Sequence, residues 1–192
     1  MQGESRKSAP AGAVVRVYWK YLREYWGYLV AVIAGTVVIQ AANLAAPIFL
    51  RQFFNILTTH APNPTLIPQL LQVLAMIALF WVIGWFGNRV QDFSNMYMGA
   101  QVMPRLYESA FQYLIKHSYN FFVSNFTGSL THRVSKFARA FESISDSILL
   151  QFFPTFLFIT GAVVVLFLHN HTLGFALGAW SVLFITFHVF VA

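Results

Sequence analysis

Apolar residues in this chain are grouped into four stretches, each long enough to cross a lipid bilayer. A transmembrane helix needs about 20 mostly apolar residues. The stretches cover residues 26–50, 66–87, 147–169 and 172–192. The last stretch is still apolar at Ala192, so we expect the chain to be cut off inside a helix. The pattern predicts an all-α integral membrane protein with four transmembrane helices.

The helical pattern of the second stretch continues beyond residue 87. Polar residues, Gln91 among them, fill one face, and the apolar seam on the other consists of Val90, Phe93, Tyr97, Ala100, Met103, Tyr107, Ala110 and Leu114. A helix over residues 66–117 would be about 78 Å long at 1.5 Å per residue. The hydrocarbon core of a bilayer is only about 30 Å thick. This helix is therefore predicted to project far into the cytoplasm, with a kink or local break at Pro104.

A second apolar seam leads into the third stretch. Polar residues such as Arg133 and Asp146 stay off this seam, whose members are Val134, Phe137, Phe141, Ile144 and Ile148. Heptad-like seams on neighbouring helices predict antiparallel packing, either on each other or on further helices. Residues 88–146 are thus expected to form a cytoplasmic helical hairpin.

The residues before the first stretch form two segments. Residues 1–13 are predicted to be a flexible cytoplasmic tail. Residues 14–25 place Arg16, Lys20 and Arg23 on one helical face, opposite an aromatic face. Such a helix is typical of segments that lie in the lipid headgroup plane. The alternative is a simple cytoplasmic extension of the first span.

Composition and charge support a membrane location. The chain is 58% hydrophobic and 9% charged, whereas soluble domains carry about 25% charged residues. The net charge of +6 arises from basic residues before residue 26 and between residues 89 and 139, with only Arg51 in the first connecting loop. Basic residues near spans mark the cytoplasmic side. We expect a multi-pass protein of the bacterial inner membrane with a cytoplasmic N-terminus, in contact with lipid and not with nucleic acid.

The sequence contains no catalytic, cofactor-binding or metal-binding motif. Cysteine is absent, which excludes disulfides and thiolate chemistry. A phosphate-binding loop requires a Gly-Lys step, and no glycine in this chain precedes a lysine. His169 and His171 lack the carboxylate or thiolate support of a metal site. The chain alone is not expected to bind ATP.

Residues 99–135, GAQVMPRLYESAFQYLIKHSYNFFVSNFTGSLTHRVS, contain a helix end, a Phe-Phe pair, a glycine and an arginine opening the next helix. Together with the order of spans, this resembles the transmembrane domain of type-1 ABC exporters. Phe121, Phe122, Gly128 and Arg133 stand at positions matching that family.

The resemblance implies a fold and a function. The chain would supply four of an expected six transmembrane helices, the second and third being prolonged into the cytoplasm and joined by a short coupling-helix turn. It would be truncated before a nucleotide-binding domain, which would lie downstream or on a separate chain and use ATP and Mg. The complete transporter would be an ATPase working by alternating access, with a homo- or heterodimer of transmembrane domains. The residues implied to dock on the ATPase domain are Phe121, Phe122, Asn125, Phe126, Gly128 and Arg133, with Gly128 permitting the chain reversal.

Polar groups within the spans are candidates for a transport pathway. Gln40 and Asn43 share one face of the first span, where amides either contact substrate or hydrogen-bond to a neighbouring helix. His188 in the fourth span either lines the pathway or is a neutral, hydrogen-bonded packing residue. Small-residue pairs are expected at close helix approaches: Ala41/Ala45, Ala42/Ala46 and Gly174/Gly178.

Two other classes of function fit four spans. One is a self-contained membrane scaffold or regulatory protein without transport activity. The other is a small proton-coupled carrier, which needs a carboxylate within a span. None of the six acidic residues lies in one of the four stretches, so the sequence favours the exporter interpretation over both alternatives.

Overall fold

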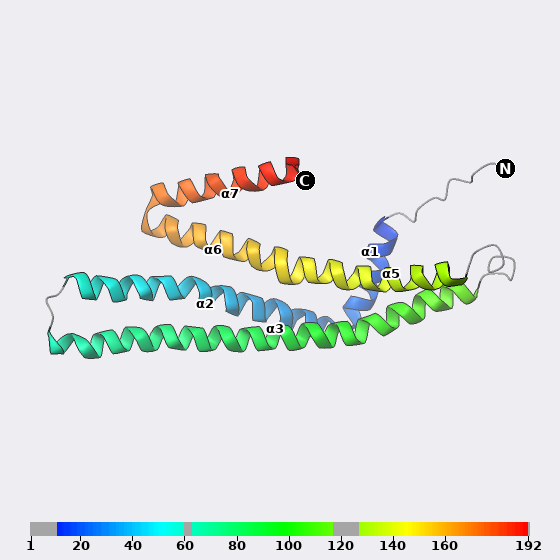
Figure 1. The fold of residues 1–192 in the computed structure, drawn as a ribbon, viewed down its shortest axis with the longest axis horizontal. Coiled ribbons are helices and arrows are strands. Elements are labelled where there is room, and N and C mark those ends of the chain that lie inside the picture. The colour runs from blue at the N-terminus through cyan, green and yellow to red at the C-terminus, as the bar shows by residue number, and fades with distance from the viewer. Residues whose placement is uncertain (1–10, 60–62, 117–126, 192) are drawn as a thin grey trace. The chain divides into compact units, whose positions relative to one another are not determined.

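The computed structural model describes residues 11–59, 63–116 and 127–191, and these residues form helices joined by short connections. No strand occurs among them, which confirms the predicted all-α class. The elements are shown in Figure 1: α1 (Ala11–Glu24), α2 (Trp26–Thr59), the 3-10 turn η1 (Pro64–Leu66), α3 (Ile67–Ile115), α5 (Thr127–Asp146), the π-helical segment η2 (Ser147–Phe152), α6 (Phe153–His169) and α7 (His171–Val191).

Three of the helices in the described part of the chain are long and apolar enough to cross a membrane. They are α2, α3 and the continuous helix Leu130–His169, and α7 adds a shorter apolar stretch, His171–Phe187. Helix α3 alone contains 49 residues, or about 74 Å at 1.5 Å per residue. It is more than twice as long as the roughly 30 Å hydrocarbon core requires.

One predicted helix boundary is wrong. Helix α2 continues to Thr59, so Arg51 lies in a helix rather than in a connecting loop. No glycine or proline interrupts residues 51–59, and the chain therefore has no local reason to leave the helix there. A kink or local break was predicted at Pro104, and helix α3 continues through this residue without a break. A proline removes one backbone hydrogen bond, and the intact turns on both sides keep the helix continuous.

The chain divides into two compact units that share its long helices. Unit 1 comprises residues 1–32 and 92–147, and unit 2 comprises residues 33–91 and 148–192. Unit 1 therefore contains α1, the start of α2, the second part of α3 and α5. Unit 2 contains the rest of α2, the first part of α3, α6 and α7.

The core of unit 1 gathers around Tyr18 of α1. Its ring centroid lies 5.0 Å from that of Phe137 and 5.4 Å from that of Phe141, both on α5. Such ring pairs add about 0.5–1.5 kcal/mol beyond the burial of area. The other buried apolar side chains of this unit are Val32, Met98, Val102, Leu106, Leu130 and Ala138.

The buried side chains of unit 1 mostly lie next to the predicted seam positions and do not coincide with them. On α3 the buried residues are Met98, Val102 and Leu106, whereas Phe93 and Tyr97 of the predicted seam are at least half exposed. The buried residues of α5 are Leu130, Ala138, Phe141 and Ser145, and only Phe141 belongs to the predicted seam. On α5, the small side chains of Ala138 and Ser145 let the helix backbones approach closely. A prediction based on large apolar residues does not include such positions.

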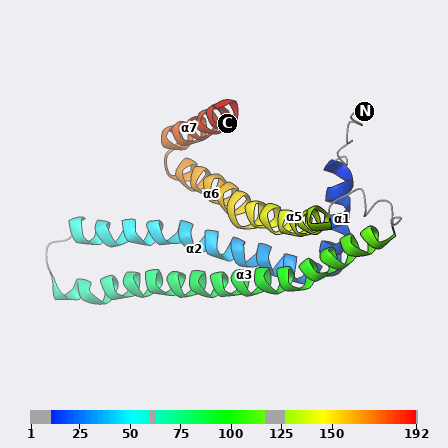
Figure 2. The ribbon, with the colours of Figure 1, turned by 45° about the vertical axis from the view of Figure 1, so that its right-hand side comes forward.

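Unit 2 joins α2 to α3 through small residues. The two helices lie side by side in both views (Figures 1 and 2). A Cβ atom added to Gly35 would lie only 2.9 Å from the carbonyl oxygen of Gly87. At the same crossing, Nε2 of Gln91 donates a buried hydrogen bond of 2.8 Å to Oγ1 of Thr36. Gln91, predicted on the solvent face, is therefore an interhelical contact residue.

Helices α6 and α7 form a tight hairpin at the other side of unit 2. The backbone N–H of Thr172 donates to Oδ1 of Asn170 at 2.9 Å, which caps the start of α7. Gly174 packs against Phe167, because a Cβ atom at Gly174 would lie 2.6 Å from the Cα atom of Phe167. The predicted close approach at Gly174 is confirmed, and at Gly178 the nearest atom is 3.7 Å away.

The helix that enters α6 changes its hydrogen-bond pattern between units 1 and 2. Residues Ser147–Phe152 form a π-helical segment that ends two residues before Pro154. Proline has no N–H and leaves the carbonyl of Leu150 without its usual donor. Local widening of the helix is a common response to such a site.

Candidate docking and ligand-contact surfaces

The residues predicted to dock on an ATPase domain fall mostly outside the described part of the chain. Phe121, Phe122, Asn125 and Phe126 lie within residues 117–126, which are outside the described residues. Arg133 lies exposed on α5, in a position accessible to a partner.

Gly128 lies inside the first turn of α5, because this helix already begins at Thr127. The predicted chain reversal at Gly128 is therefore wrong. Backbone N–H groups in a first helical turn have no intrahelical partner, so a glycine is tolerated there at little cost.

A buried hydrogen bond fastens α1 to α5. The hydroxyl group of Tyr18 donates to the backbone carbonyl of Phe137 at 2.7 Å, and the Tyr18 side chain is 7% exposed. Burial raises the pKa of this hydroxyl above its ordinary value, because the charged phenolate loses its hydration. The contact holds the amphipathic N-terminal helix on the helix that carries Arg133.

We predict that Tyr18→Phe weakens the attachment of α1 to α5 by about 1 kcal/mol, because it removes one hydrogen bond and keeps the ring packing. The free energy of unfolding, followed by tryptophan fluorescence, measures this change. Tyr21→Phe on the same helix is the matched control and should leave stability unchanged. Equal stability of Tyr18→Phe and the wild type would contradict the role of the hydroxyl.

The same pair of proteins should differ in alkaline solution. The folded state of the wild type holds the Tyr18 proton more tightly than the unfolded chain does, since the folded pKa is raised. Its stabilisation is therefore complete below about pH 10 and is lost as pH rises toward the folded pKa. The Tyr18→Phe variant lacks this loss, so its stability should fall less steeply above pH 10.

The predicted pathway residues are only partly brought together. Nδ2 of Asn43 donates to Oε1 of Gln40 at 3.4 Å on an exposed side of α2. Among the described contacts, this amide pair is bonded within its own helix, and Thr36 and Gln91 supply the bond between helices. His188 lies in α7.

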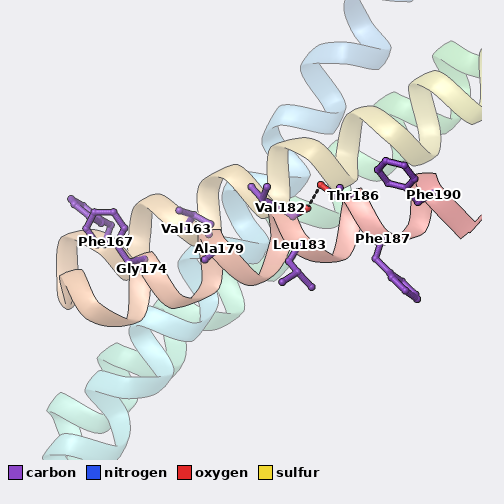
Figure 3. Close-up of a pocket in the computed structure, with 11 residues that line it drawn as sticks. Val163, Phe167, Gly174, Ala179, Val182, Leu183, Thr186, Phe187 and Phe190 are labelled. Atoms are coloured by element: carbon purple, nitrogen blue, oxygen red, sulfur yellow. Dashed lines mark hydrogen bonds between the residues drawn. The ribbon is translucent and has the colours of Figure 1, made fainter.

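An apolar groove lies between α6 and α7 (Figure 3). Its volume is about 1070 Å³, and its walls include Val163 and Phe167 of α6 together with Leu183 and Phe187 of α7. The hydroxyl of Thr186, also in the wall, donates to the carbonyl of Val182 at 2.8 Å. The groove therefore suits lipid tails or another apolar helix.

A second groove, here called the α2–α6 groove, combines apolar walls with polar groups at one end. Its volume is about 510 Å³. The lining residues are Asn43, Leu44, Pro47, Ile48 and Arg51 of α2, Phe158, Ala162, Val165, Leu166 and His169 of α6, and Asn170 and Leu173 at the start of α7. Of the predicted pathway residues, Asn43 belongs to this groove.

Unit 1 contains a small pocket with polar groups that was not predicted from the sequence. Nδ2 of Asn95 on α3 donates to Oδ1 of Asp146 on α5 at 3.1 Å. The pocket beside this bond measures about 180 Å³ and includes Glu142 and Ser145. Because Asp146 is the last residue of α5, the bond fixes α3 to the end of that helix.

The geometry can be compared with known protein families. Residues 29–192 match the family model described as the ABC transporter transmembrane region. This range includes α3, α5, α6, α7 and nearly all of α2. No curated protein matches the chain.

Proposed function

The chain belongs to the family of ABC transporter transmembrane regions, and from this membership we propose that it is the membrane-spanning part of an ATP-driven exporter. The chain provides a path for substrate across the bilayer by alternating access. Hydrolysis takes place on an ABC nucleotide-binding domain, located downstream or on a separate chain, which holds the ATP and Mg. Two transmembrane domains, as a homo- or heterodimer, complete the transporter.

The observation that carries this proposal is the length of two helices. Helix α3 has 49 residues, and the continuous helix Leu130–His169 has 40. About 20 residues suffice to cross the hydrocarbon core. The residues of each helix that exceed this length are those nearest in sequence to the segment 117–126. These helix extensions connect a partner domain to the membrane spans.

The distribution of charge supports a cytoplasmic location for these helix extensions. Basic residues are concentrated before residue 26 and between residues 89 and 139, which favours a cytoplasmic location for both segments. We propose four spans in the bacterial inner membrane, a cytoplasmic N-terminus and an interfacial position for α1. In this arrangement the segment 117–126 faces the cytoplasm.

The proposed docking surface is the end of this hairpin. Phe121, Phe122 and Phe126 supply an apolar contact, Asn125 a polar one, Gly128 a close approach of backbones and Arg133 a positive charge. Aromatic residues are enriched among the contact residues of protein interfaces. Gln40, Asn43 and His188 remain our proposed pathway contacts within the spans.

A photo-crosslinking experiment tests the proposal. A crosslinking amino acid at Asn125, in native membranes, should capture an ABC ATPase domain, whether it lies on another chain or on a longer form of this one. The matched control places the same crosslinker at Thr58, near the C-terminal end of α2. This position should not capture the ATPase domain. If the Asn125 position captures no ATPase domain, the protein is better described as a membrane scaffold.

A further inference from the structure

We propose that the α2–α6 groove binds a single-chain amphiphile with a carboxylate head group. Arg51, His169 and Asn170 hold the head group, and the apolar wall between Asn43 and Arg51 holds the chain. This inference rests on the placement of α2 and α6 across a bilayer. It does not require ATP or an ATPase domain, so binding and transport are tested separately.

Charge is the first argument for an anionic ligand. Unit 2 contains no aspartate or glutamate, and Arg51 and Arg89 are its two basic residues. Nothing within this unit can neutralise Arg51 by an ion pair. A guanidinium group presents parallel N–H donors that match a carboxylate in a bidentate arrangement. One such cation complements one carboxylate.

The register of the two helices brings the polar groups to one end of the groove. A Cβ atom added to Gly161 of α6 would overlap the Cδ1 atom of Leu44 of α2, so these positions lie opposite each other. Both helices run in the same direction in Figures 1 and 2. Advancing seven or eight residues from each position places Arg51 level with His169.

The length of the groove along α2 suits a segment of an acyl chain. Asn43 and Arg51 are eight residues apart on α2, or about 12 Å along the helix. Arg51 follows Trp26 by 25 residues, which is about 37 Å and places it at the far membrane interface. A head group at Arg51 thus meets the interface, and its chain extends toward the centre of the bilayer.

Proline supplies a further polar group at the deep end. Pro47 lies inside α2 and has no N–H to donate to the carbonyl oxygen of Asn43. Both residues line the groove. A carbonyl group without its helical donor is costly in hydrocarbon, and an amphiphile carrying a hydroxyl along its chain can satisfy it.

The size and the apolar wall select the class of amphiphile. A volume of about 510 Å³ lies within the range of about 300–1,000 Å³ typical of ligand pockets. It accommodates one acyl chain, whereas a phospholipid has two. The groove between α6 and α7 is larger, but its wall contains no charged side chain. The α2–α6 groove is therefore the one that can distinguish an acid from a neutral lipid.

Photolabelling of the full chain in phosphatidylcholine vesicles tests the proposal. The probes are a long-chain fatty acid with a photoactivatable group in its chain and the methyl ester of the same acid. We expect the acid to label α2 and α6 about tenfold more than the ester, since a hydrogen-bonded charge pair contributes on that scale. Arg51→Gln should reduce labelling by the acid to the level of the ester.

Three controls separate this result from a folding defect or a lipid effect. Arg51→Lys keeps the charge and should retain most of the labelling, and Arg89→Gln, at the other basic residue of unit 2, should retain all of it. Ala162→Phe fills the groove and should reduce labelling by both probes. Equal labelling of the wild type by acid and ester would overturn the proposal. Competition by phosphatidylglycerol as strong as by unlabelled fatty acid would also overturn it, because the groove would then be an ordinary lipid contact.

Discussion

Gly35→Ala should destabilise the pairing of α2 and α3 by about 1–3 kcal/mol, the usual cost of inserting a methyl group where there is no room. The new Cβ atom would lie 2.9 Å from the carbonyl oxygen of Gly87 and 3.0 Å from the backbone nitrogen of Gln91. Both are main-chain atoms, so no side-chain rotation relieves the clash. The helices must separate, and the buried bond between Gln91 and Thr36 lengthens as they do.

Unfolding in detergent micelles, measured as a midpoint and a free energy, tests this prediction. Gly27 lies in the same helix and Gly99 in α3, and a Cβ atom at either would meet nothing within 4 Å. Alanine at these two positions should be neutral or stabilise by up to about 1 kcal/mol, since glycine is the poorer helix former. A Gly35→Ala protein as stable as the Gly27→Ala protein would show that the helices do not cross closely at this point.

The existence of these helices was predictable because a bilayer allows few alternatives. A stretch of about 20 apolar residues must satisfy its backbone hydrogen bonds internally, and a helix does so. Continuation of α3 beyond residue 87 followed from its periodicity. The predicted end of α2 was wrong, because the apolar stretch stops at Leu50 while helix-compatible residues continue to Thr59. Hydropathy therefore locates a span, and it does not locate the end of a helix.

The contacts between helices were harder to predict, because they depend on both partners. Among the small-residue pairs, Ala42 is buried and its Cβ atom would face a Cβ atom added to Gly84 at 3.3 Å. Ala41, in the neighbouring pair, is exposed. Nothing in the sequence of α2 alone indicates that Gly35 meets Gly87. Likewise, Gln91 is polar and was assigned to the solvent face, although a hydrogen bond to Thr36 makes its burial favourable.

The candidate sites show the same division. The groove residues Asn43, Pro47 and Arg51 follow one another at intervals of four, which places them on one face of α2. The sequence predicts Asn43 as a pathway residue and places Arg51 in a loop, so their common helical face becomes apparent only in the structure. The opposite wall, from Phe158 to His169, belongs to a helix more than a hundred residues later. Only the fold brings these two faces together.

The second prediction with a large effect concerns Phe121 and Phe122 in the assembled transporter. Replacing both residues with alanine should uncouple ATP hydrolysis from transport. Each aromatic anchor at an interface contributes about 2 kcal/mol or more, so the loss of two anchors is enough to reduce transport at least about tenfold. Hydrolysis should continue, because its chemistry takes place in the ATPase domain.

The experiment measures transport and hydrolysis on the same vesicle preparation, because the ratio of the two rates reports the coupling between them. Phe93→Ala is the matched control: this phenylalanine is 55% exposed on α3 and lies well before the proposed docking surface. It should leave the ratio unchanged, so a general effect of removing a phenylalanine ring is excluded. An unchanged ratio for the double variant would mean that the force of hydrolysis reaches α3 and α5 by another contact. Arg133, exposed on α5, would then be the next residue to replace.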